Sequence, residues 1–342
     1  MMAVTHRRRV LLLPCLSALA ASCGGAQNMM MPAGPAAAGI ARLGWLVLGV
    51  FSVVSVLMWG LIFWSAARRQ GSLLVHAPWN ASEDRRWILI GGFTIPVLAL
   101  ATIFIVMLRT MSAFPMGDHE MRNMSSSIRV VGHQWWWEVE YLTPRTDMRV
   151  ITANEIHIPA GVPVDIELAS EDVIHSFWIP RLHGKVDLIP GTTTHLRLQA
   201  DSPGAYQGQC AEYCGPQHAH MALLVVSEQA AAFDEWLGRL RSPAATPTDS
   251  DAVSGEQVFM THQCALCHTV RGTPAQGLVG PDLTHFGGRT RLAANAFPNS
   301  TAPLSAWVTH AQSMKPNAQM PSMASFSGAE LREMVAYLQG LK

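Results

Sequence analysis

Residues 208–221 read Gly-Gln-Cys-Ala-Glu-Tyr-Cys-Gly-Pro-Gln-His-Ala-His-Met, which places two thiols, an imidazole and a thioether in one short loop. The spacing is Cys210-x3-Cys214-x3-His218-x2-Met221. A mononuclear blue-copper site needs one thiolate, imidazoles and a weak thioether, which such a loop supplies together with an upstream histidine. Two thiolates in the same loop can both bridge a pair of copper ions. The stretch therefore predicts a binuclear electron-transfer centre on a β-sandwich.

The upstream imidazole is assigned to His175, which follows Asp172-Val-Ile and precedes an apolar run. A disulfide between Cys210 and Cys214 is the alternative in an exported domain, but it leaves His218 and its thioether neighbour without a role. His220 lies beside the ligand positions but off their spacing, and is read as a surface or core-edge histidine.

A second cofactor motif lies downstream, where the chain reads Cys264-Ala-Leu-Cys267-His268. This is the signature of covalently attached c-type haem, in which the two thiols bond the vinyl groups and the histidine becomes an axial iron ligand. The sequence therefore predicts one haem c in addition to the copper pair.

Four stretches of the chain resemble cytochrome c oxidase subunit II, in that family's order and spacing. They are Gly132-His-Gln-Trp-Trp-Trp137, Asp172-Val-Ile-His-Ser-Phe177, Gly184-Lys-Val-Asp-Leu-Ile-Pro-Gly191 and the Cys/His/Met loop. The resemblance implies a cupredoxin-like fold with a binuclear CuA centre of two copper ions, and Trp135 as the residue through which electrons enter the copper domain.

The same resemblance implies which residue binds each copper ion. Cys210 and Cys214 bridge both ions; His175 and Met221 complete one, and His218 with the backbone carbonyl of Glu212 complete the other. In that family the Glu212 carboxylate faces subunit I and holds a magnesium ion, so magnesium is expected at that interface.

The C-terminal part resembles monohaem cytochrome c, through Gly255-Glu-Gln-Val-Phe259, Gly280-Pro-Asp-Leu283 and Lys315-Pro-Asn-Ala-Gln-Met-Pro321 around the haem motif. The resemblance implies that Pro281 supports the proximal His268 and that Met320 is the distal axial ligand. Met314 and Met323 compete for that position, but neither is followed by proline.

The first 23 residues have the features of an export signal, with Arg7-Arg8-Arg9 before an apolar run and small residues before Cys23. Cleavage before Cys23 would create a lipid-bearing N-terminus, and simple cleavage after Ala20 or Ala21 is the alternative. Cys15 also lies in this leader. Because the other four cysteines serve copper and haem, no structural disulfide is expected.

Two uncharged apolar stretches, 43–67 and 87–108, would be about 37 and 33 Å long as helices, enough to cross a bilayer. The loop between them is rich in arginine, which places it in the cytoplasm by the positive-inside rule. The protein is therefore expected to cross the bacterial inner membrane twice, with its copper and haem domains on the periplasmic side. Glu83 or Asp84 could mark a proton-uptake entrance, or could be plain interfacial carboxylates beside the neighbouring arginines.

The predicted fold is multidomain: a two-helix transmembrane hairpin, an all-β cupredoxin-like Greek-key sandwich and an all-α monohaem cytochrome c domain. Strands are predicted from alternating polarity at 128–131, 164–168, 194–198 and 222–226, a helix at 229–240, and a capping box at Ser327-Gly-Ala-Glu330. A Pro- and Ser-containing stretch reads as a flexible linker with a root-mean-square span of about 20 Å. The expected ranges are 1–23 for the export signal, 40–110 for the hairpin, 125–240 for the CuA domain, 241–252 for the linker and 253–342 for the cytochrome.

The 24 basic and 24 acidic residues balance, so no strong field favours nucleic acid as a partner. The resemblances imply a subunit of a proton-translocating cytochrome c oxidase. Electrons from a cytochrome c or a quinol-oxidising complex would pass through haem c to CuA, and on to haem-copper oxidase subunit I, which reduces oxygen to water with the other oxidase subunits.

Two alternatives stay open. One is the electron-donating subunit of a CuA-containing nitric oxide reductase, which identification of the co-purified large subunit would separate. The other is a copper-delivery module, against which the full ligand set argues, because delivery needs open, exchangeable ligands. A nitrous oxide reductase would need a second catalytic domain that 342 residues cannot hold.

Overall fold

The computed structural model describes residues 25–68, 85–112, 128–142 and 150–342. The export signal with Cys15 and Cys23, most of the arginine-rich loop, and the carboxylates Glu83 and Asp84 lie outside these residues. The chain divides into two units, one made of 38–116 and the other of 1–37 together with 117–342.

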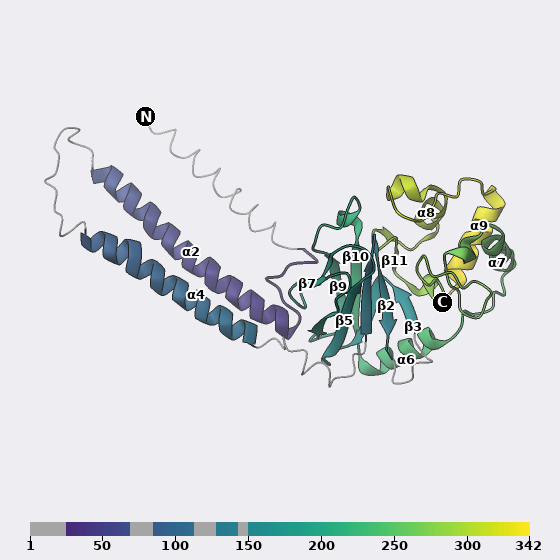
Figure 1. Ribbon diagram of the computed structural model, residues 1–342, viewed down its shortest axis with the longest axis horizontal. Helices are drawn as coiled ribbons and strands as arrows, with labels where there is room; N and C mark the ends of the chain where they lie inside the picture. The colour runs from purple at the N-terminus through teal and green to yellow at the C-terminus, as the bar shows by residue number, and fades with distance from the viewer. Residues whose placement is uncertain (1–24, 69–84, 113–127, 143–149) are drawn as a thin grey trace, which may run out of the picture. The chain divides into compact units, whose positions relative to one another are not determined.

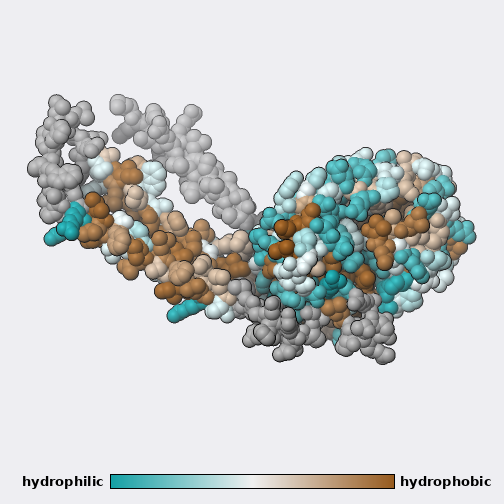
Figure 2. All heavy atoms as spheres, in the orientation of Figure 1, coloured by the Kyte–Doolittle hydropathy of each residue, from teal (hydrophilic) through white to brown (hydrophobic). Residues whose placement is uncertain are grey.

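The unit 38–116 is a pair of apolar helices (Figure 1). Helix α2 spans Pro35–Arg68, and a π-helical segment, Ile88–Thr94, continues into α4, Ile95–Ser112. Pro96 has no N–H and its ring crowds the carbonyl four residues earlier, which accounts for the widened turn before it. Large apolar side chains are exposed along both helices, as the brown surface in Figure 2 shows. Both helices are long and apolar enough to span a membrane.

The copper-binding sequence belongs to a sandwich of two five-stranded sheets (Figure 1). One sheet has the order β3-β2-β1-β5-β8 and the other β4-β10-β9-β6-β7. The predicted strands and the Greek-key sandwich are confirmed. The strands are β1 Ile128–His133, β2 Trp136–Tyr141, β3 Val150–Ala153, β4 Glu155–Pro159, β5 Val164–Ser170, β6 His175–Trp178, β7 Val186–Leu188, β8 Thr194–Leu198, β9 Gly204–Cys210 and β10 Ala222–Glu228.

The sandwich core is built from the inward positions of both sheets, which alternate with outward ones as strand geometry requires. Trp137, Ile166 and Phe177 are among its fully buried side chains. The core reaches the copper loop itself, because Cys210 and Met221 belong to the same apolar cluster. The loop is therefore anchored at both ends in packed structure.

The segment before α2 also packs on the sandwich. The Ala33 N–H donates to Arg181 O at 2.7 Å, and the Asp201 N–H donates to Ala33 O at 2.8 Å. Gly34 is required there, because a Cβ would lie 2.2 Å from Gln199 O. Nothing in the sequence pattern predicted this attachment.

Helix α6, Ala230–Arg241, follows the last strand and confirms the predicted helix. Its Trp236 stacks on the His157 imidazole at a centroid distance of 3.9 Å and meets Tyr141 edge-on. Glu155 and Glu228 hold the two ring nitrogens of His157 at 2.9 and 3.0 Å. These contacts fix α6 against the sandwich.

The cytochrome domain is formed by α7 Ser250–Thr261, α8 Thr301–Met314 and α9 Gly328–Gly340, with a small hairpin of β11 Arg291–Leu292 and β12 Phe297–Pro298. The predicted capping box opens α9, with Ser327 and Glu330 bonded reciprocally. Helices α7 and α9 cross closely at Gly255, where a Cβ would meet Glu333 O at 2.1 Å. This crossing accounts for the glycine in the stretch before the haem motif.

The stretch between the two domains is bonded to the cytochrome along its first residues, which differs from the expected free tether. The Arg271 guanidinium donates to Leu240 O and Arg241 O, and the Ala244 N–H donates to Arg271 O at 2.9 Å. His285 Nε2 lies 3.0 Å from Ser242 O. Side chains of the cytochrome thus hold the start of the stretch.

Candidate copper and haem centres

The predicted copper ligands come from the ends of three neighbouring strands. His175 opens β6 and Cys210 closes β9, which pair so that Phe177 lies opposite Cys210. Met221 lies directly before β10, and the Cys210 N–H donates to its carbonyl at 2.9 Å. This bond closes the loop, so that residues three to eleven positions apart in sequence converge on one point.

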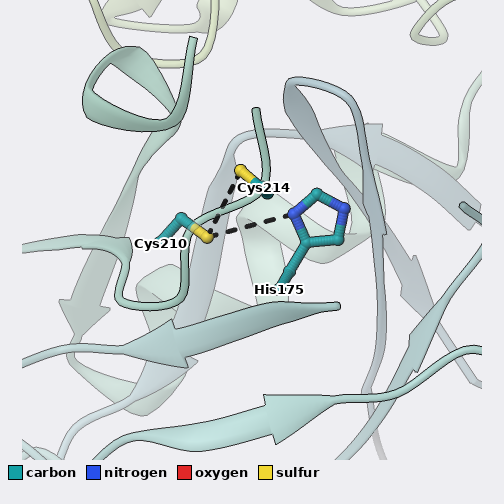
Figure 3. A group of neighbouring side chains, drawn as sticks. All are labelled: His175, Cys210 and Cys214. Atoms are coloured by element: carbon teal, nitrogen blue, oxygen red, sulfur yellow. Dashed lines mark hydrogen bonds between the residues drawn. The ribbon is translucent and has the colours of Figure 1, made fainter. Parts of the chain in front are cut away.

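The converging atoms are close enough to share a binuclear metal centre. The Cys210 and Cys214 sulfurs are 3.8 Å apart, and His175 Nδ1 lies 3.9 Å from Cys210 Sγ. Figure 3 shows the imidazole and the second thiol both directed at the Cys210 sulfur. On the other side of the pair, Cys214 Sγ lies 3.7 Å from His218 Nδ1 and 3.8 Å from Met221 Sδ. Among the described residues, His175 and the two cysteines also form a buried metal-binding group by proximity alone.

The Glu212 backbone joins this group and its side chain does not. Its carbonyl oxygen is 3.2 Å from Cys210 Sγ, whereas its carboxylate is 46% exposed and 3.5 Å from Lys185 Nζ. This geometry agrees with the two roles predicted for Glu212, in which the carbonyl faces the copper site and the carboxylate faces outward. His220 is exposed and its Nδ1 lies 2.8 Å from Gln217 Oε1, away from the sulfurs.

A carboxylate orients the buried imidazole. Asp172 Oδ1 lies 2.8 Å from His175 Nε2, which leaves Nδ1 free to face the thiols. The other oxygen of Asp172 accepts the Gln134 N–H at 2.6 Å. Partners of this kind fix the tautomer and direction of metal-ligating histidines. Gly132 leaves room for the ring, since a Cβ would lie 2.8 Å from His175 Cδ2.

The local charges favour a thiolate at Cys210. Hydrogen bonds from the Cys214 thiol and from His175 lower the pKa of Cys210, although burial opposes this. Burial alone would lower the pKa of His175, but its bonds to Cys210 and Asp172 raise it. Because copper binds the thiolate form, this arrangement suits a soft cation.

Trp135, 7% exposed, touches both predicted centres. Its indole Nε1–H donates to Cys214 O at 2.9 Å, and Gln134 Nε2 donates to the same carbonyl at 2.8 Å. Trp135 also lines the cavity described next. The aromatic residue singled out in the sequence therefore lies between the copper loop and the cytochrome.

A cavity of about 200 Å³ is lined mostly by the cytochrome domain and partly by the copper domain. Its wall includes Cys264, Cys267 and His268 from the haem motif and Trp135 from the copper domain. His268 Nδ1 lies 2.8 Å from Pro281 O, which confirms the support expected from that proline and leaves Nε2 for a metal. Burial lowers the pKa of His268, which favours the neutral imidazole that binds iron.

The cavity wall includes two of the three candidate distal methionines. Met320 and Met323 both line it, and Met314 is not among its lining residues. Met323 also packs against the domain's apolar core. The choice of Met320 stays a prediction.

The donor sets fit the cofactors that the motifs imply. Two thiols, a neutral imidazole and thioethers around one apolar cavity suit a covalently bound haem. Two thiols within 4 Å of each other, with two imidazoles, a thioether and a carbonyl, suit a copper pair. Cofactor-binding domains of this kind, on a chain with two membrane-length helices, define a membrane-anchored electron-transfer protein.

Comparison with known proteins gives the family. The cytochrome c oxidase subunit II periplasmic domain matches residues 126–228, and cytochrome c matches residues 252–342. The chain is 33% identical to cytochrome c oxidase subunit 2 of Alkalihalophilus pseudofirmus, over 98% of this chain and 97% of that one. It is 29% identical to the Bacillus subtilis protein of the same name, over 99% of both.

Among solved structures, the periplasmic domain of subunit II of the cytochrome oxidase of Bradyrhizobium japonicum is 26% identical, covering 33% of this chain and 91% of that one with a TM-score of 0.31. The chain belongs to the cytochrome c oxidase subunit II family and carries a C-terminal cytochrome c domain. It is thus a membrane-anchored component of an oxidoreductase complex with its copper domain in the periplasm, and the family implies CuA, haem c and association with subunit I.

Contacts between the two domains are the part of the site that the sequence did not predict. Lys315 Nζ donates to Trp135 O at 2.8 Å, and Gln217 Nε2 donates to Pro316 O at 2.9 Å. The Ala222 N–H donates to Ala294 O at 3.1 Å. In the sequence, Lys315 is the first residue of the Lys-Pro-Asn-Ala-Gln-Met-Pro stretch. That pattern indicates a distal methionine and gives no indication of a contact with another domain.

Proposed function

We propose that this chain receives electrons at its cytochrome domain and passes them, within the same polypeptide, to its copper domain and on to subunit I. Cys264, Cys267, His268 and Met320 would hold the haem; the copper ligands would be His175, Cys210, Glu212 O, Cys214, His218 and Met221. When bound, these groups supply one-electron redox chemistry, in which one electron leaves the ferrous haem and one enters the oxidised copper pair.

The observation that carries the proposal is the position of Trp135. Trp135 lines the cavity that contains the haem-attachment thiols, and its indole N–H donates to the carbonyl of Cys214, which would be a copper ligand. One side chain thus provides a continuous packed and hydrogen-bonded connection between the two centres. Trp136 lines the same cavity but stacks on His133 instead of reaching the copper loop.

The protein residues do three things in this scheme. Asp172 holds the His175 ring in place, Trp135 bridges the two centres, and the apolar walls exclude water from them. Electron transfer without bond rearrangement needs no acid or base, which agrees with ligand sets that leave no position for a substrate.

Several finer parts of the function belong to the same proposal. The donor is a cytochrome c or a quinol-oxidising complex, and the final acceptor is oxygen. The exposed Glu212 carboxylate would hold magnesium where the copper domain meets subunit I, after displacing Lys185. The two apolar helices would lie in the bacterial inner membrane.

The test is a Trp135→Phe substitution in the full-length subunit within the assembled oxidase. We expect slower electron transfer from haem to copper and lower oxygen consumption with the native donor, because the indole bridge to Cys214 O is lost. Reduction of the copper pair by a small soluble mediator should be unchanged, since the mediator does not use the haem.

Trp236→Phe is the matched control, because it makes the same chemical change in the same domain, against His157 and away from both centres. An unchanged haem-to-copper rate in Trp135→Phe would refute the role of Trp135. Copper that is never reduced by the haem in the unmodified protein would refute the proposed direction of flow.

A further inference from the structure

Lys315 is buried where a charged side chain is costly. It is 3% exposed, and its Nζ donates to Trp135 O at 2.8 Å and to Ala293 O at 3.3 Å. In the described part of the chain no carboxylate forms an ion pair with it. Burial lowers the pKa of Lys315 to about 7, which expresses the same cost. The other two lysines of the chain, Lys185 and Lys342, are exposed.

Such a residue is a poor choice for stability alone. A well-packed apolar side chain at a buried position is often as stabilising as a buried charge, or more so. The lysine instead imposes a geometric requirement: its side-chain nitrogen can donate to both carbonyls only when the two backbone segments lie in the correct relative position. One carbonyl belongs to the copper domain and the other to the cytochrome, so Lys315 bonds the two domains together at this point.

The Lys315 contact lies beside the loops that carry the predicted cofactor ligands. Lys315 precedes Met320 by five residues and is bonded to the peptide of Trp135, whose ring is bonded to Cys214 O. Beside it, Pro316 O accepts a hydrogen bond from Gln217, which lies between two copper ligands in sequence. The distal-ligand loop of the cytochrome is thus bonded to the copper domain at two adjacent residues, once at the copper loop and once at the Trp135 peptide.

We infer that Lys315 is a positioning residue that fixes the distal-ligand loop of the cytochrome on the Trp135 peptide, so that the cytochrome delivers electrons from one docked position. The inference rests on the proposed direction of electron flow. Lys315 does not touch the copper ligands and carries no electron itself. It acts by setting the distance and orientation between the two centres.

The experiment compares Lys315→Met with Lys342→Met in the full-length subunit of the assembled oxidase. Methionine keeps the length and loses the donor, and Lys342→Met removes the same charge from an exposed terminus. The first readout is the haem-to-copper rate after rapid haem reduction. The second is hydrogen exchange of the Ala222 amide, which bonds across the domains, with the Leu224 amide, bonded to Asn154 O inside the copper domain, as internal reference.

We expect the haem-to-copper rate to fall about tenfold or more and Ala222 exchange to accelerate by a similar factor in Lys315→Met, as for loss of one hydrogen bond to a charged group. Leu224 exchange, the haem spectrum and direct copper reduction by a mediator should stay as in Lys342→Met. Lys315→Gln, which keeps an uncharged NH2 donor group, should recover part of both changes and serves as the test if the methionine variant does not fold.

An unchanged rate would overturn the inference, whatever the exchange shows, because docking would then not control transfer. A slower rate with unchanged Ala222 exchange would also overturn it, because Lys315 would then act on electron flow without positioning the domains. Failure of the proposed function is distinct: the haem of the unmodified protein would not reduce the copper, while the exchange measurement would still report docking.

Discussion

Replacing Asp172 by asparagine tests whether the carboxylate beside His175 is needed to hold copper. Asp172 accepts two hydrogen bonds at Oδ1, from His175 Nε2 at 2.8 Å and the Val173 N–H at 2.6 Å, and one at Oδ2 from the Gln134 N–H at 2.6 Å. All three partners are donors. An asparagine amide has a single oxygen, so its NH2 group must face at least one of those donors.

The magnitude follows from the hydrogen bonds that the substitution removes and from the burial of the ring. His175 is 0% exposed, so water cannot replace the missing acceptor. Loss of a carboxylate that orients a ligating histidine typically costs about 10- to 100-fold in metal affinity, or about 1.4 to 2.7 kcal/mol. We expect a loss near the upper end of this range, because the same oxygens also hold the backbone next to Trp135.

The assay is copper retention by the full-length protein against increasing chelator, followed through the optical signal of the copper pair. Glu171→Gln is the control, since it removes the same charge one residue away from an exposed side chain. The haem absorption should not change in either variant. Equal chelator resistance of Asp172→Asn and Glu171→Gln would refute the reasoning, because the carboxylate would then have no orienting effect.

Two further predictions concern the cytochrome domain. Met320→Ala should leave the haem attached through Cys264 and Cys267 but open its iron to added ligands, which a change from a low-spin absorption spectrum would show. Met323→Ala should leave the spectrum low-spin. The reverse result would assign the distal position to Met323. Hydrogen bonds with Ser327 lower the pKa of Glu330 from 4.5 to about 2, so its stabilising contribution is complete above pH 4.5 and is lost as the pH falls toward 2. In acid unfolding of the full chain, Glu330→Gln should therefore show a weaker pH dependence between pH 4.5 and 2, and an unchanged slope would contradict the capping role.

The sequence predicted features that depend on neighbours along the chain. The copper loop spans twelve residues, from Cys210 to Met221, and its ligands converge because the β9 and β10 ends lie side by side. The capping box spans four residues and forms as expected. In each case the chemistry requires particular residue types at a short spacing, and the backbone has few ways to arrange them.

The features that the sequence did not predict join residues far apart. Lys315 and the Trp135 carbonyl are 180 positions apart, and Asp172 and the Gln134 N–H are 38 apart. No spacing along the sequence predicts either contact, because each depends on how whole domains or whole strands pack. In the sequence, Asp172 is recognised only as part of the motif that contains His175. A carboxylate three residues before a histidine does not by itself indicate which ring nitrogen it will accept a hydrogen bond from.

The hydrogen bonds between the domains restrict the cytochrome more than the covalent linker alone would. A free linker of a dozen residues would have a root-mean-square span of about 20 Å. It would raise the local concentration of the cytochrome at the copper domain without selecting an orientation. Here Arg271 holds the start of that stretch against the cytochrome, and Lys315 and Gln217 bond the cytochrome to the copper domain. The Gln217 bond joins the copper loop to the stretch that carries Met320, and the Lys315 bond joins the same stretch to the Trp135 peptide. In the proposed scheme the fusion keeps the cytochrome near, and these bonds select the orientation in which Trp135 connects the two centres.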